Sequence, residues 1–152
     1  MMKQINSLVP ELWCSDFDKS LNFYINVLGF AVVQRRDQSH HAYLELEGAQ
    51  IMLASWEQDG TWETGAFEKP FGRGINFQVL VENAQGLHER VLANEVHPFV
   101  EIHTKEYWRT GRMDTRKEFA VLDPDGYLLR FTQIISHRPI TQTDLDELDS
   151  GD

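Results

Sequence analysis

The first half of the chain alternates short β-rich runs with one segment of helical period. Apolar residues recur every three or four positions from Phe17 to Leu28, and Gly29 stands where such a helix would end. The β-rich runs that follow include two joined through Gly48, as in a hairpin. This half therefore predicts a βαβββ unit, with a strand at 8–14, a helix starting at Asp16, and strands at 30–35, 42–47 and 49–55.

The second half repeats this order. Asn83 is a favourable helix cap, and it lies 67 positions after Asp16. Asp123-Pro124-Asp125-Gly126 is a strong turn signal between two β-rich runs and matches the hairpin at Gly48. We predict a second βαβββ unit, with a strand at 74–81, a helix at 83–94, and strands near 99–102, 117–122 and 127–133.

Three segments fall outside the repeat. Residues 57–73 form a linker that carries large aromatic residues between its glycines and Pro70, and residues 104–116 are an insertion too long for a plain turn. Either segment could pack against the body, a second subunit or a ligand. Residues 137–152 form an acidic tail, flexible or at most a short exposed helix. We predict one domain at 1–136, composed of modules at about 1–56 and 74–135.

The net charge and the single cysteine disfavour several classes of function. The chain has 152 residues and a formal net charge of −10, which disfavours nucleic-acid binding. The acidity serves solubility or attracts a cationic ligand. Cys14 alone cannot form an internal disulfide or a multi-cysteine metal site, and no apolar run is long enough for a membrane span. We expect a cytoplasmic protein without nucleic-acid or membrane partners.

Both halves resemble the vicinal oxygen chelate superfamily. The resemblance lies in residues 10–24 (PELWCSDFDKSLNFY) and 28–30 of the first half, and in residues 119–131 (FAVLDPDGYLLRF) of the second. The second motif is similar to the closing hairpin of the glyoxalase and bleomycin-resistance branch, specifically of its bleomycin-resistance proteins. The resemblance implies an α+β fold of tandem βαβββ modules that form an open, curved mixed sheet, whose cup holds a metal or a ligand.

Metal-dependent members of this superfamily carry His, Gln or Glu ligands on the first and last strand of each module. The corresponding positions here are Val9, Met52, Asn76 and Arg130, a poor set for a divalent cation. We therefore expect no metal, no other cofactor and no catalytic residues. One other arrangement has ligand chemistry, because His97, Glu101 and His103 could share one face of a strand.

The resemblance implies a homodimer that sequesters a bulky, cationic, bleomycin-like antibiotic in clefts between subunits. Alternation places Val9, Glu11 and Trp13 on one face of the first strand, and the resemblance implies that this face lines the cup. Glu11 could instead pair with Arg130 in an internal network. A metal-dependent glyoxalase or dioxygenase, and a structural dimer without ligand, remain alternatives. The predicted ligand-binding residues are Glu11, Trp13, Met52, Trp56, Trp62, Asn76, Gln78, Tyr107, Trp108 and Arg130.

Overall fold

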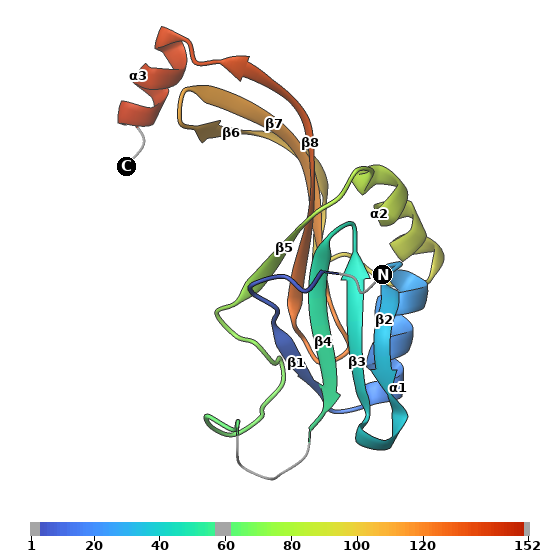
Figure 1. Cartoon of the computed structure of the whole chain (residues 1–152). Helices are drawn as coiled ribbons and strands as arrows, with labels where there is room; N and C mark the ends of the chain where they lie inside the picture. Colours follow the sequence, from blue (N-terminus) through green and yellow to red (C-terminus); the bar gives the residue numbers. More distant parts are fainter. Residues whose placement is uncertain (1–3, 57–61, 151–152) are drawn as a thin grey trace.

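Each half of the chain forms its own βαβββ module in the computed structural model, which describes residues 4–56 and 62–150 (Figure 1). The first module contains β1 (Glu11–Cys14), α1 (Phe17–Asn22) with its π-helical continuation η1 (Phe23–Val27), β2 (Ala31–Arg36), a 3-10 turn η2 (Asp37–Ser39), β3 (His41–Leu46) and β4 (Ala49–Ser55). The second contains β5 (Asn76–Leu80), α2 (Ala84–Ala93), β6 (Val100–Arg109), β7 (Arg112–Leu122) and β8 (Leu128–Pro139), and α3 (Gln142–Ser150) follows it.

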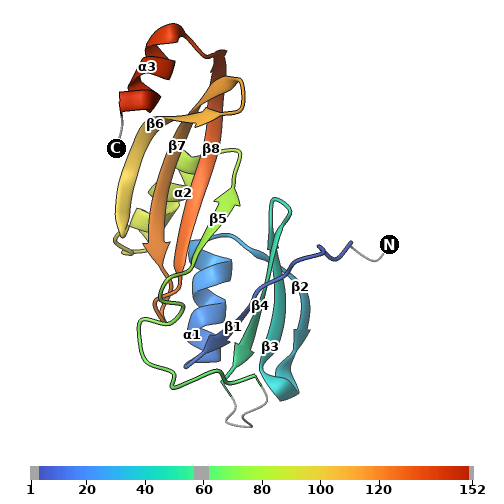
Figure 2. The ribbon, with the colours of Figure 1, turned by 90° about the vertical axis from the view of Figure 1, so that its left-hand side faces the viewer.

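The strand order confirms the predicted repeat. The first sheet, here called sheet A, has the order β1-β4-β3-β2, and sheet B has the equivalent order β5-β8-β7-β6. In each sheet the first and last strands of the module are parallel and the other neighbours are antiparallel. The two mixed sheets remain separate, one per module, and Figure 2 shows them displaced from one another.

The two main helices begin where the sequence predicts. The side chain of Asp16 accepts a hydrogen bond from the backbone N–H of Lys19 at 3.0 Å, and the side chain of Asn83 accepts one from Gly86 at 2.9 Å. Each bond satisfies an N–H group that the first helical turn leaves without a partner. After η1 the chain leaves the helix at Gly29, whose φ of +86° favours glycine.

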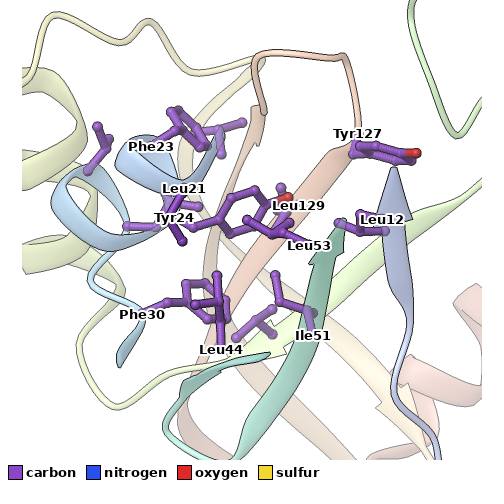
Figure 3. Close-up of a cluster of buried hydrophobic side chains, with 14 of the residues drawn as sticks. Leu12, Leu21, Phe23, Tyr24, Phe30, Leu44, Ile51, Leu53, Tyr127 and Leu129 are labelled. Carbon is purple, nitrogen blue, oxygen red and sulfur yellow. The ribbon is translucent and has the colours of Figure 1, made fainter. Parts of the chain in front are cut away.

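One core joins the modules. Tyr24 and Phe30 of the first module, which are fully buried, meet in an edge-to-face contact with ring centroids 5.5 Å apart. Figure 3 shows Leu129 of the second module in the same cluster as Tyr24 and Leu53. Phe119 and Phe131 stack on each other within sheet B and belong to the same core. One hydrophobic core is therefore shared by residues of both modules.

The turn between β7 and β8 holds the modules together. The Asp125 carboxylate accepts hydrogen bonds from the backbone N–H of Ser15 at 2.9 Å and from the Ser15 hydroxyl, and Lys69 lies 3.0 Å from it. The Tyr24 hydroxyl donates to Asp123 of the same turn at 3.0 Å. Gly126 has a φ of +95°, and an added Cβ would lie 2.7 Å from Cα of Pro70, so glycine is required there.

Residues 104–116, assigned to an insertion outside the repeat, are almost entirely β-strand. They extend β6 and β7, with Tyr107 opposite Asp114, and only Thr110 and Gly111 make the turn. The polar composition of this hairpin masks its strand pattern. Figure 1 shows β6, β7 and β8 curving away from the body as one arm.

Regular secondary structure continues beyond residue 136. β8 continues to Pro139 because His137, Arg138 and Pro139 pair with the start of β7. Arg138 then forms ion pairs with Glu106 of β6 and Asp144 of α3. Of the predicted tail, residues 142–150 therefore form a short and mostly exposed helix attached to the arm.

The described part of the linker packs onto the body. Phe71 is buried, with its ring centroid 6.0 Å from that of Tyr127, and Phe67 packs against the core. Residues 57–61 of the predicted linker lie outside the described residues. Among the helices of the described chain, none has the length and apolar content to cross a membrane.

Candidate ligand-binding site

Each sheet has one face against the helices and one open face. In β1, Leu12 and Cys14 are buried, whereas Glu11 is exposed and Trp13 is half-buried, as the predicted alternation requires. The parallel pairs Glu11–Met52 in sheet A and Gln78–Arg130 in sheet B occupy the same place in the two modules. The register therefore places these four predicted site residues on the open faces, two in each module.

The open face of sheet A carries an aromatic cluster. Trp13 and His41 flank the small Ala54, because both pair with it across the sheet. The Trp56 and Trp13 rings lie 5.0 and 6.3 Å from the ring of Phe67, which belongs to the linker. These contacts fix the orientation of both indoles, so flat apolar surface is preorganised on this face.

Two donors of this face lack hydrogen-bond partners in the described structure. They are the buried Nε1 of Trp56 and the buried Nδ1 of His41. Burial and the nearby Arg36 lower the pKa of His41, although the charge of Glu11 acts in the opposite direction. His41 is therefore uncharged near neutral pH.

The open face of sheet B is polar. Arg130 donates to the Gln78 side chain at 2.6 Å, so Arg130 pairs with an amide and not with Glu11 as in the internal network considered above. The Glu118 carboxylate, although buried, accepts hydrogen bonds from the Tyr107 and Thr132 hydroxyls. The bond to Glu118 together with burial raises the pKa of Tyr107, so the phenol stays protonated and donates.

Not all predicted site residues lie on these faces. Trp108 follows Tyr107 in β6 and therefore projects to the opposite side of the sheet, where it is 49% exposed. Trp62 lies in the linker and is 73% exposed. Asn76 is exposed at the start of β5, beside Leu128. The structure thus groups Trp13 with Trp56 and Gln78 with Arg130, and leaves Trp108 and Trp62 apart.

The histidines do not converge with acids on a metal site. The predicted shared face of His97, Glu101 and His103 was wrong, because His97 precedes β6 and the strand register shifts between Val100 and His103. Glu101 contacts His88 of α2 at 3.4 Å, whereas His103 lies 3.6 Å from Glu118 on the open face. Within residues 4–56 and 62–150, no three His, Cys, Asp or Glu side chains are grouped so that they could hold a metal ion.

Several residues of the open faces were missed in the sequence. Glu118 and Thr132 are polar residues next to apolar ones in strands that were predicted, so period-two patterning of the sequence could have indicated them. Lys105 and Arg116 were assigned to the insertion, yet both lie against the Tyr107 ring, with Nζ of Lys105 5.5 Å and Cζ of Arg116 5.1 Å from its centroid. Nothing in the sequence indicated a role for Phe67 beyond its place in a linker rich in aromatic residues.

The structure thus consists of tandem βαβββ modules, each with a mixed sheet that has helices on one face and an open second face. The sequence profile described as "Glyoxalase/Bleomycin resistance protein/Dioxygenase superfamily" matches residues 4–131, and the chain belongs to this superfamily.

This chain is also similar to curated proteins and to solved structures. Bleomycin resistance proteins from Geobacillus stearothermophilus and Staphylococcus aureus are 27% identical over 137 residues, covering 84% of this chain and 96% of theirs. A glyoxalase/bleomycin resistance protein/dioxygenase superfamily member from Vibrio splendidus is 35% identical over 82% of this chain and 95% of its own, with a TM-score of 0.39. The crystal structure of TioX from Micromonospora sp. ML1 has the same fold, with a TM-score of 0.67 at 20% identity, covering 86% of this chain and 99% of its own.

Proposed function

We propose that the protein binds and sequesters a bulky, partly aromatic and cationic molecule of the bleomycin type without changing it chemically. The observation that carries the proposal is the aromatic cluster on the open face of sheet A, where Phe67 holds Trp13 and Trp56. The exposed Glu11 lies beside Trp13 and supplies a carboxylate for a cationic group. The curated relatives named bleomycin resistance proteins support the ligand class.

A second copy of the chain completes the site in this proposal. In one copy both open faces meet solvent, and β2, at the edge of sheet A, is exposed along its whole length. Apolar side chains such as Phe99, 60% exposed, and Val32, 43% exposed, remain uncovered. Two-fold association would cover such surface and place an open face of each copy against the ligand. We therefore propose a homodimer. We also propose a cytoplasmic location, which suits a protein that sequesters a small molecule.

Titration calorimetry with bleomycin tests the proposal. We expect saturable binding, one molecule per cleft, and a Trp13→Ala variant should lose roughly 1–3 kcal/mol of binding free energy because its indole stacks on the ligand. Trp108→Ala, on the other side of sheet B, and Trp62→Ala are matched controls that should retain the wild-type affinity. No heat and no thermal shift at saturating bleomycin would exclude this ligand, and equal losses in all three variants would place the site elsewhere.

The electrostatic part of the proposal has its own test. A Glu11→Gln variant keeps the shape of the side chain but removes its charge, so the affinity for the cationic ligand should fall and should depend less on salt. Sedimentation velocity at micromolar concentration tests the dimer, and a monomer that binds bleomycin at full affinity would contradict the proposed two-copy site.

A further inference from the structure

A hollow of about 480 Å³ opens beside β8 where β5 ends. Leu80, Thr132 and Ile134, which line its floor, belong to the open face of sheet B. Leu80 is 52% and Ile134 40% exposed, so the floor presents apolar surface that the described chain leaves uncovered. Glu47 and Glu82 also line the hollow, and the Glu47 carboxylate accepts a hydrogen bond from the backbone N–H of Glu82. The hollow has the volume of a small-molecule site.

Two guanidinium groups flank this floor. Arg116 is paired with Ile134 across the strands, and Arg130 lies two residues before Thr132 on the same face. Each has a buried Nε–H that finds no acceptor among residues 4–56 and 62–150. The described chain therefore leaves the hydrogen-bonding capacity of both guanidinium groups incompletely used, and an anion that pairs with such a group gains affinity.

The neighbouring carboxylates do not satisfy these two donors. Glu118 already accepts the hydroxyls of Tyr107 and Thr132. Asp114 receives Nη2 of Arg116 at 3.3 Å and also lies 2.8 Å from Nε of Arg112, so more than one guanidinium shares its charge. Arg116, Arg130 and Lys105 thus place three positive charges on this part of the open face, next to the carboxylates of Glu118 and Asp114, while Glu47 and Glu82 line the hollow away from these strands.

We infer that the open face of sheet B recognises an aromatic or otherwise flat apolar molecule through a carboxylate, sulfonate or phosphate group. The apolar body would cover Leu80 and Ile134, and the anionic oxygens would pair with the guanidinium groups of Arg116 and Arg130 beside them. The inference rests on the proposed binding function, since it assigns ligand chemistry to the second module of the same protein.

A pair of fluorescent probes separates charge recognition from apolar binding. 8-Anilinonaphthalene-1-sulfonate carries a sulfonate on an aromatic body, and N-phenyl-1-naphthylamine has a similar body without the charge. We expect the double variant Arg116→Gln/Arg130→Gln to bind the sulfonate about tenfold or more weakly, with the affinity for the neutral probe unchanged. Arg73→Gln, an exposed arginine of the linker, is the matched control, and Arg130→Lys should recover only part of the affinity because lysine lacks the planar fork.

Thermal unfolding of each variant shows whether the fold is retained. Leu80→Asp should weaken both probes, since it places a charge on the apolar floor. Unchanged sulfonate affinity in the double variant, an equal loss for both probes, or no binding of the sulfonate by the wild type would overturn the inference. If the sulfonate behaves as expected but bleomycin does not bind, the proposed drug class fails while the anion site stands.

Discussion

Replacing Asp125 with Asn should loosen the connection between the two modules. Asp125 is 1% exposed, and its carboxylate takes two hydrogen bonds from Ser15 and one contact from Lys69. The side-chain amide of the variant keeps one oxygen as an uncharged acceptor, and an NH2 donor replaces the other oxygen. Since a hydrogen bond to a charged group contributes about 1.5–3 kcal/mol and Ser15 can rotate its hydroxyl, we expect a loss of about 2 kcal/mol.

Thermal unfolding followed by circular dichroism measures this loss. For a chain of this length, about 2 kcal/mol corresponds to a fall in Tm of roughly 4–8 °C. Lys69→Gln is the control, because the Lys69 side chain is 56% exposed and an exposed ion pair contributes at most about 1 kcal/mol. If Asp125→Asn unfolds within about 2 °C of the wild type, or if Lys69→Gln loses as much, the assigned role of the carboxylate is wrong.

The difference in stability between the wild type and Asp125→Asn should also depend on pH, in a direction that follows from the pKa of Asp125. Burial raises the pKa of Asp125, but the hydrogen bonds from Ser15 and the charge of Lys69 outweigh it, and the pKa lies below its usual range. The stabilisation is therefore complete above the unfolded-state pKa of about 4 and is lost as the pH falls through the lower folded-state pKa. The difference in Tm between wild type and Asp125→Asn should shrink below about pH 4, and a difference that persists in stronger acid would contradict this assignment.

Three further predictions follow from other parts of the molecule. Burial raises the pKa of the Cys14 thiol to about 12. A thiol reagent at mildly alkaline pH should therefore label Cys14 only at the rate at which the protein unfolds. Immediate labelling of the native protein would contradict the burial of Cys14. Truncation after Ile140 removes α3, whose Leu145 and Leu148 are half exposed, and should change Tm little. Truncation after Ser136 also removes three residues of β8 that pair with β7, and it should therefore lower Tm more. Untagged protein dialysed against nickel or zinc should retain no stoichiometric metal by mass spectrometry; one bound equivalent would restore the enzyme alternative.

Local patterns in the sequence were sufficient for the elements of the repeat. The caps at Asp16 and Asn83 and the turn at 123–126 are set by side chains within a few residues of the backbone groups that they satisfy, so each can be recognised without the rest of the fold. The alternation in β1 also placed Glu11 and Trp13 on the open face and Cys14 in the core, because a strand turns successive side chains to opposite faces.

The long arm could not be predicted in this way. Its strands are polar on both faces along much of their length, and the cross-strand partners, not a local apolar pattern, keep them extended. The register shift between Val100 and His103 likewise reversed the face on which His103 lies relative to Glu101, and only pairing with β7 reveals it.

The sequence by itself therefore determined the two modules, their order and the residues of the first strand that face outward. The tertiary structure decided which side chains meet: Phe67 with the two indoles, Glu118 with Tyr107 and Thr132, and Asp125 with Ser15. Caps, turns and alternation depend on neighbours along the chain. These contacts instead join residues far apart in sequence, whose proximity is fixed by strand register and by packing of the common core.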